Sequence, residues 1–145
     1  AEDATINILE QLQVKDYYKP GRVTVLEEGT TLKALTNIIA NTNELYFPVR
    51  NDDGAISGIL SINNVRHVLF EQGLFDLLVV RDVATRPAVL HPDDDLYTAL
   101  LKFVETDYGQ IPVVSPEDDD SIIGLVNRED VFHAYAKTIK SVKSM

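Results

Sequence analysis

The sequence contains no cysteine, which excludes disulfide bonds, thiolate metal sites and cysteine nucleophiles. It also has no apolar run approaching the roughly 18 residues of a membrane-spanning helix. The first ten residues, AEDATINILE, lack both the basic start of a signal peptide and an initiator methionine. We therefore expect a domain cut from a longer chain, and the absence of cysteine is compatible with a reducing compartment.

Basic residues are scarce: the chain has 13 Lys and Arg against 23 Asp and Glu, a net charge of −10. Proteins that bind nucleic acids usually carry a basic face that displaces counterions. Because this chain would repel a phosphate polymer, we expect no nucleic-acid partner. A small anion still fits, since one arginine and a helix N-terminus suffice locally.

Signals for metal binding and catalysis are missing as well. The histidines at 67, 91 and 133 share no ligand spacing, so no metal site is predicted. The acidic runs 93–95 and 117–120 lack the spacing of a calcium loop, and we interpret them as solvated turns and helix caps. No phosphate-binding loop, G-x-S-x-G or G-x-G-x-x-G motif occurs. We therefore predict no catalytic residues and do not expect an enzyme.

What the sequence does contain is a repeat. The stretch YFPVRNDDGAISGILSINNV at 46–65 has a ragged copy, QIPVVSPEDDDSIIGLVNREDV, at 110–131. Pro48 recurs as Pro112, 64 positions later, and Gly58 recurs as Gly124, 66 positions later. The apolar fraction of 45% supports a real core. Two copies of about 60 residues would each be marginal alone, so we expect them to pack together.

Each copy shows the same order of elements. Short apolar runs at 22–26 and 87–90 predict strands, and TLKALTNIIAN and DLYTALLKFVE predict amphipathic helices capped by Thr30, Thr31 and Asp93 to Asp95. Two strands follow in each copy, joined in the first by the hairpin turn 51–54. INNVRHVLF and REDVFHAYAKTI predict closing helices. Pro48 and Pro112 are expected at a strand edge or start, where a missing N–H harms no ladder.

This pattern resembles the CBS motif, and the pair resembles a tandem CBS (Bateman) module. The phrases that carry the resemblance are FPV…SGILSINNV and IPVV…IGLVNREDV, with VRDVATRPAVLHPDDDLYTAL before the second. The resemblance implies an α/β (α+β) fold of two motifs related by a pseudo-twofold axis, each strand-helix-strand-strand-helix. The expected boundaries are a linker or helix at 1–13, motifs at 14–70 and 80–136, a linker at 71–79 and a helical tail at 137–145.

A narrower resemblance concerns the parent protein. NILEQLQVKDYYKPGRVTVL and RHVLFEQGLFDLLVVRDVA look like the cytoplasmic C-terminal CBS pair of bacterial ClC-type chloride channels and transporters. This resemblance implies a soluble domain on the cytoplasmic side of the cell membrane. Its partners would be the membrane-embedded part of the same chain and a second copy in a homodimer.

The CBS resemblance also implies a ligand. No cofactor is required, but such pairs bind ATP, ADP, AMP or sometimes S-adenosylmethionine as regulatory ligands, at sites that combine both motifs. One candidate site joins Asn127, Arg128 and Asp130 to Thr24, Val25, Leu45, Tyr46 and Phe47. The other joins Ser61 and Asn64 to Pro87, Val89, Gly109 and Gln110. Lys19 and Arg22 are further candidates for phosphate contacts.

Each candidate also has a structural interpretation. Ser61-x-x-Asn64 and Asn127-x-x-Asp130 fit ordinary helix caps, and Tyr46 and Phe47 fit a core. Glycines 58 and 124 fit close strand packing. Neither site is complete, because Asn127 stands where the family has a hydroxyl and Asn64 where it has Asp. The alternative function is a dimerisation module without ligand, using the stripes Leu32/Leu35/Ile38/Ile39 and Val131/Phe132/Tyr135.

Overall fold

The computed structural model describes the backbone of residues 2–144 and the side chains of residues 4–71 and 73–144. The chain forms two compact units, and their boundaries cut across the sequence repeat. The central unit is residues 23–87, and the terminal unit combines residues 1–22 with 88–145. Within residues 2–144, no helix is both long enough and apolar enough to cross a bilayer.

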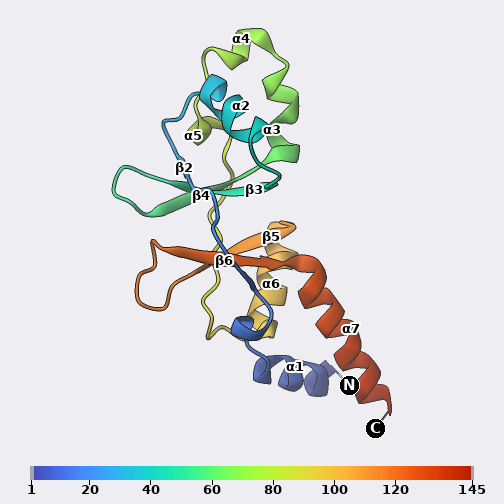
Figure 1. The fold of residues 1–145 in the computed structure, drawn as a ribbon. Helices are drawn as coiled ribbons and strands as arrows, with labels where there is room; N and C mark the ends of the chain where they lie inside the picture. Colours follow the sequence, from blue (N-terminus) through green and yellow to red (C-terminus); the bar gives the residue numbers. More distant parts are fainter. Residues whose placement is uncertain (1, 145) are drawn as a thin grey trace. The chain divides into compact units, whose positions relative to one another are not determined.

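The central unit is a three-stranded sheet with helices (Figure 1). Its elements are β2 (Leu26–Glu27), α2 (Leu32–Ala40), β3 (Tyr46–Arg50), β4 (Ile56–Ser61), α3 (Ile62–Leu69), α4 (Gln72–Phe75) and α5 (Val80–Val83). Strand β3 lies in the middle, parallel to β2 and antiparallel to β4. Apolar residues from every element except α4 form one core: Leu26, Leu32, Leu35, Phe47, Val49, Leu60, Ile62, Val65, Val68 and Val80.

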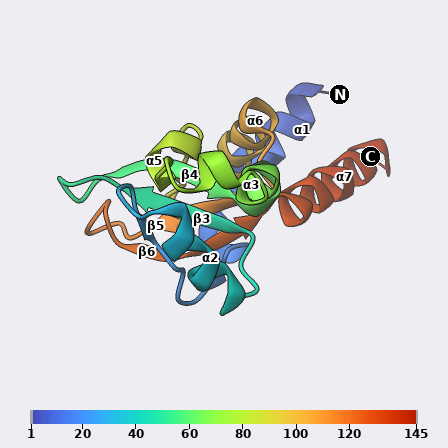
Figure 2. The same cartoon turned by 90° about the horizontal axis from the view of Figure 1, so that it is seen from above.

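The terminal unit has the same helix, two strands and closing helix, with the helix α1 added before them and a longer closing helix α7 (Figure 2). Its elements are α1 (Glu2–Gln11), a 3₁₀ turn η1 (Val14–Asp16), β1 (Lys19–Pro20), α6 (Leu96–Thr106), β5 (Gln110–Val114), β6 (Ile122–Asn127) and α7 (Arg128–Ser144). The sheet order is β1-β6-β5, all antiparallel, and α1 packs against α6 and α7. The fold class predicted from the sequence is confirmed, since the helix, two strands and closing helix recur in both units.

The two hairpins share even their irregularities. In the central unit Val49 lies opposite Gly58, and the register shifts at the next residue. In the terminal unit Val113 lies opposite Gly124, with the same shift one residue later. Equivalent sequence positions therefore take equivalent structural positions.

Each sheet is completed by the segment that precedes the other repeat. Residues Lys19 and Pro20, which lead into the first repeat, pair with β6 of the terminal unit. Thr85, which leads into the second repeat, exchanges backbone hydrogen bonds of 2.8 and 3.0 Å with Ile59 of the central unit. The glycine of each hairpin lies under this crossing segment.

Both hairpin glycines are there because the crossing segment approaches too closely for a side chain. A Cβ on Gly58 would lie 2.8 Å from the Thr85 carbonyl oxygen. A Cβ on Gly124 would lie 2.8 Å from Tyr18 Cδ2 and would also meet the Lys19 backbone. The interpretation of these glycines as sites of close packing is confirmed.

The predicted first strands are largely wrong. Of residues 22–26 only Leu26 is in a strand, and of 87–90 only Leu90 pairs, in an isolated bridge to Val113. Pro48 and Pro112, in the neighbouring strands, explain why these segments pair so little. Ile59, opposite Pro48, uses its backbone groups on Thr85, and the Pro112 carbonyl accepts from Leu90 N. The backbone groups of each proline are thus on the side of the predicted first strand. Because proline has no N–H, the first strand cannot form one of its hydrogen bonds there.

The proline prediction was itself half right. Pro48 and Pro112 each lie third in a five-residue strand, not at its start, and Pro48 is in the central strand of its sheet. Neither proline harms the hairpin, because its N–H would point away from the hairpin partner. The predicted edge position is therefore wrong for Pro48 and right for Pro112, whose strand β5 is at the edge of its sheet.

The hairpin turn at 51–54 and the caps at Thr31 and Asp95 are confirmed. Asn51 Oδ1 accepts the N–H groups of Asp53 and Ala55 at 3.0 Å each, and Gly54 closes the turn at φ +86°. Thr31 caps α2, and Asp95 caps α6 by accepting Thr98 N–H at 2.7 Å. These short polar side chains satisfy helix N–H groups that have no partner within the helix.

The stripes proposed as subunit interfaces belong mostly to the units themselves. Leu32 and Leu35 are fully buried, and Ile38 and Ile39 pack against the same core. Val131 is also fully buried, whereas Phe132 and Tyr135 are 39% and 37% exposed. The first stripe and Val131 are therefore corrected to core positions, because each helix needs an apolar face to attach it to its own sheet.

Candidate functional site

Asp130 lies at the start of the long helix α7. Strand β6 ends at Asn127 and α7 begins at Arg128, so no loop separates them. Asp130 is half-buried in the first helical turn, next to Glu129. A carboxylate there is stabilised by the helix dipole and lies near N–H groups that the helix leaves free.

Asn127 is held by the neighbouring strand. Its Oδ1 accepts a hydrogen bond of 2.7 Å from Gln110 Nε2, and the two residues are Cα partners between β5 and β6. The Asn127 carbonyl is therefore engaged within the hairpin. Its NH₂ group is the part that remains to donate to a ligand.

Arg128 connects the start of α7 to the end of α6, where Asp107 is the C-cap residue. The Arg128 guanidinium pairs with Asp107 at 2.9 Å and lies 5.7 Å from the centre of the Phe132 ring, and the backbone N–H of Arg128 donates to Gly109 O. The two ion-pair side chains are 40% and 92% exposed, so the pair contributes at most about 1 kcal/mol. Asp107 is therefore a partner that an anion can replace.

In the central unit, the Glu44 carboxylate accepts two hydrogen bonds from Thr24, a contact that sequence reasoning missed. The Thr24 backbone N–H donates to Glu44 Oε1 at 2.8 Å, and the Thr24 hydroxyl donates to Glu44 Oε2 at 2.6 Å. Thr42 donates to the same carboxylate at 2.8 Å. These hydrogen bonds hold the segment before β2, which lies outside any strand. The neighbouring Val25 is half-buried in that segment.

The residues at the start of β3 differ in what they offer. Leu45 is 51% exposed, and its carbonyl accepts Ile62 N–H. Phe47 is fully buried in the core, which confirms its structural interpretation and removes its ring as a stacking surface. Tyr46 is half-buried and opposite Ser61. Tyr46 is therefore the aromatic residue of this stretch that remains a candidate for stacking.

Ser61 occupies the N-cap position of α3 without acting as a cap. Its backbone is extended, but its side chain makes no cap hydrogen bond, and the residue is only 5% exposed. The interpretation of Ser61 as a capping residue is therefore wrong. Asn64 is exposed in the first turn of the same helix.

The remaining candidates lie in loops and edges. Val89 is half-buried, and its carbonyl accepts a 2.6 Å hydrogen bond from Lys102 Nζ, a contact absent from the sequence prediction. Lys19, Arg22 and Pro87 are exposed. Among the described residues, no group of three or more His, Asp or Glu is arranged to hold a metal ion.

Strand pairing thus brings together residues that had been assigned to different sites. Tyr46 faces Ser61 in one hairpin, and Gln110 faces Asn127 in the other. The predicted grouping of Asp130 with Tyr46 joins residues of different units and stays a prediction. The start of α7 is polar and charged, with Arg128, Glu129 and Asp130 in its first turn.

Comparison with known proteins decides the family. The family described as "CBS domain" matches residues 14–71 and again residues 80–137. The chain belongs to the CBS domain family. It carries two CBS motifs in tandem, in agreement with the repeat read from the sequence.

Its relatives are distant. The curated "Methylated protein MJ0556" of Methanocaldococcus jannaschii is 24% identical over 144 residues, covering 94% of this chain and 82% of that protein. The CBS domain of a bacterial CNNM/CorC family Mg²⁺ transporter in complex with ATP is 19% identical with a TM-score of 0.70, covering 93% and 96% of the two chains. CBSX2 in complex with AMP is 24% identical with a TM-score of 0.65, covering 89% and 98%; CBSX2 is a protein of Arabidopsis thaliana. These structural likenesses establish the shared fold.

Proposed function

We propose that this CBS pair is a regulatory module that binds an adenine nucleotide, with Asp130 as its central contact. The observation that carries the proposal is the half-buried carboxylate in the first turn of α7, beside an arginine whose ion pair is exposed. Complexes of distant relatives with ATP and AMP support it, since those proteins share this fold.

The chemistry suits a ribose and a phosphate. A carboxylate accepts two O–H groups at once, and hydrogen bonds to a charged acceptor are stronger than neutral ones. Arg128 can leave Asp107 for a phosphate that offers more acceptor oxygens. In the site predicted from the sequence, the half-buried Tyr46 ring is the group that could stack on the adenine.

We favour the Asp130 site over the Ser61 site because only the Asp130 site contains a carboxylate at the family's Asp position. Asn64, the residue that would replace the carboxylate in the second site, is neutral and exposed. Ser61 has a hydroxyl that its helix does not use as a cap, so this site keeps one polar contact. We therefore propose that the second site binds more weakly.

We also propose that the chain forms a homodimer, as the alternative function of a dimerisation module requires. Leu101 and Val104 of α6 are 48% and 66% exposed, and Phe132 and Tyr135 of α7 are exposed as well. Apolar side chains that remain exposed on neighbouring helices mark an association surface. Light scattering over a concentration series tests it, and a monomer at every concentration would contradict it.

For the parent protein we propose a membrane transporter, as the resemblance to ClC-type C-terminal domains implies, with the nucleotide acting on transport. Solved structures of the same fold belong to a Mg²⁺ transporter and also to a transcriptional regulator of Streptococcus pneumoniae, so they do not single out chloride channels. The coding sequence upstream of Ala1 tests this directly: apolar helices there support it, and a DNA-binding domain contradicts it.

The nucleotide proposal is tested by calorimetric titration of the wild-type chain with AMP, ADP, ATP and S-adenosylmethionine. Asp130→Ala removes a charged acceptor, which costs about 1.5–3 kcal/mol of binding, or roughly 10- to 150-fold in affinity. Asn64→Ala is the matched variant, and it should cost less because its contact is neutral. No heat and no melting shift with any of the four ligands at millimolar concentration would leave the dimerisation module as the function.

A further inference from the structure

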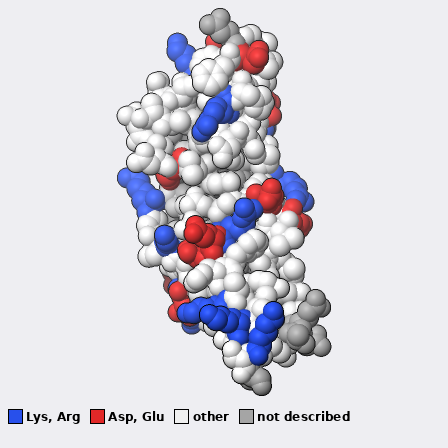
Figure 3. All heavy atoms as spheres, turned by 90° about the vertical axis from the view of Figure 1, so that its right-hand side faces the viewer, with Lys and Arg blue, Asp and Glu red and all other residues white. Residues whose placement is uncertain are grey.

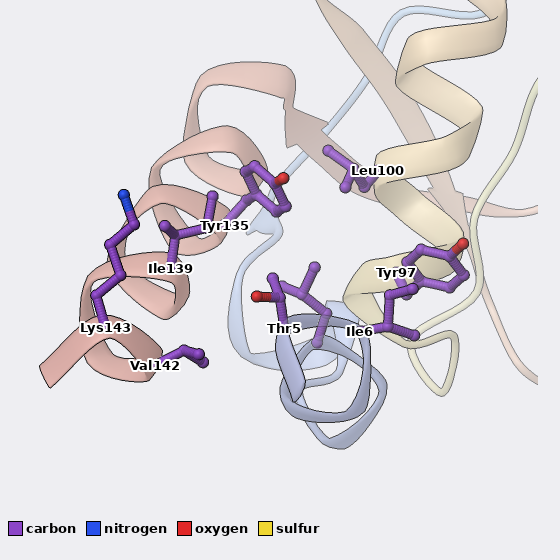
Figure 4. A pocket seen from close by; sticks show the side chains of 9 residues that line it. Thr5, Ile6, Tyr97, Leu100, Tyr135, Ile139, Val142 and Lys143 are labelled. Carbon is purple, nitrogen blue, oxygen red and sulfur yellow. The ribbon is translucent and has the colours of Figure 1, made fainter. Parts of the chain in front are cut away.

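The terminal unit contains a cavity that Asp130 does not line and that the proposed nucleotide site does not use. It has a volume of about 410 Å³ and lies between helices α1, α6 and α7. Figure 4 shows Tyr135, Ile139, Val142 and Lys143 along α7 on one side, Thr5 and Ile6 on α1, and Leu100 with Tyr97 on α6. Small-molecule pockets in proteins span roughly 300–1,000 Å³, so the volume is that of a ligand site.

The cavity exists because α7 continues its apolar face beyond the core. The buried residues of this helix end at Thr138, yet Ile139 and Val142 follow at the spacing of the same face. Both are half-buried, because α1 approaches them without filling the space. Water in such a space would lie against mostly apolar walls, which favours its replacement by an apolar group.

Among the described residues that line the cavity, Lys143 is the charged one, and Thr5, Tyr97 and Tyr135 carry hydroxyl groups. Lys143 is exposed, so its ammonium lies at the rim of the cavity. In Figure 4 the Tyr97 hydroxyl points away from α7. From Val131 to Ser144 the helix carries Lys137, Lys140 and Lys143 and no acidic residue, in a chain whose net charge is −10. Lys and Arg side chains gather over this end of the unit in the space-filling view (Figure 3).

We propose that this cavity binds a small amphiphilic carboxylate, an aliphatic acid of medium chain length. The hydrocarbon chain would lie against Ile6, Leu100, Ile139 and Val142. The carboxylate would pair with the Lys143 ammonium at the rim of the cavity. An uncharged alcohol of the same length would keep the apolar contacts and lose the ion pair, and a cationic amphiphile would be repelled.

The test is calorimetric titration of the 145-residue chain with octanoate, with octanol and an octyl-ammonium salt as matched probes. We expect saturable octanoate binding that AMP does not compete, weaker octanol binding, and none for the cation. Lys143→Gln should weaken octanoate about 2- to 5-fold, the range of a solvent-exposed ion pair, and leave octanol unchanged. Lys140→Gln removes a neighbouring charge that does not line the cavity and should leave both unchanged.

A filling variant makes the result decisive. Val142→Trp places a ring in the cavity from the last turns of α7, away from the buried residues of the helix, and should abolish octanoate binding while the melting temperature stays within a few degrees. Two results would overturn the proposal: no octanoate binding by the wild type, or equal octanoate binding by Val142→Trp.

Discussion

The close approach at Gly124 allows a direct test of the crossing segments. Adding a Cβ to this residue places it 2.8 Å from Tyr18 Cδ2 and 3.0 Å from the Lys19 carbonyl carbon, and against the Lys19 carbonyl oxygen. Two of these three atoms belong to the backbone of β1, which pairs with β6 at this point. Gly124→Ala therefore cannot be relieved by a side-chain rotation alone and must displace β1 from its sheet.

The expected cost follows from the nature of the obstacle. Overpacking costs about 1–3 kcal/mol, and a backbone obstacle places this substitution near the upper end. In a chain of this length about 1 kcal/mol corresponds to roughly 2–4 °C, so the melting temperature should fall by about 6–12 °C. Thermal unfolding followed by circular dichroism measures this shift.

Two other glycines calibrate the experiment. Gly58→Ala should behave like Gly124→Ala, because its Cβ would lie 2.8 Å from the Thr85 carbonyl oxygen. Gly73→Ala is the control: nothing lies within 4 Å of its added Cβ, and alanine is the better helix former, so stability should hold or rise slightly. If Gly124→Ala has the same melting temperature as the wild type, β1 does not pack on Gly124 of β6 as described.

The other predictions use the same kind of measurement. Asp95→Ala removes the N-cap of α6 and should lower the free energy of unfolding by about 1 kcal/mol in urea denaturation, whereas an unchanged midpoint would mean that the cap contributes nothing. Glu44→Ala leaves the N–H and hydroxyl of Thr24 without their acceptor and should cost about 1–3 kcal/mol; a neutral effect would show that water replaces the carboxylate. Asp107→Asn keeps a residue that tolerates φ +59° but weakens the hold on Arg128, so AMP should bind up to about 5-fold more tightly, and unchanged affinity would exclude Arg128 from the phosphate site.

Much of the fold was predictable because its signals are local. The leucine spacing of α2 and α6, the caps at Thr31 and Asp95 and the turn at Gly54 all act within a few residues of chain. The repeat added the order of elements, since equivalent positions of the two similar sequences take equivalent places in the two hairpins.

What sequence reasoning missed depends on contacts between distant residues. Gly58 and Gly124 indicate that a segment packs closely on each hairpin, but nothing in the sequence says that Thr85 pairs with Ile59 or Lys19 with Leu125. The compact units could therefore not be inferred. The hydrogen bonds between Thr24 and Glu44 join residues 20 positions apart, and no sequence motif predicts them. Ser61 matched a cap pattern, but that pattern does not determine where its hydroxyl points.

The central claim is that Asp130 serves a nucleotide and not only its helix. The measurement that separates these roles is AMP titration of Asp130→Asn beside the wild type, with the melting temperature of each. Asparagine retains an acceptor for the start of α7 but loses the charge, so we predict an unchanged melting temperature and an affinity lowered about 10-fold or more. Equal AMP affinity in the two proteins, or a fall in melting temperature without a fall in affinity, would contradict the account.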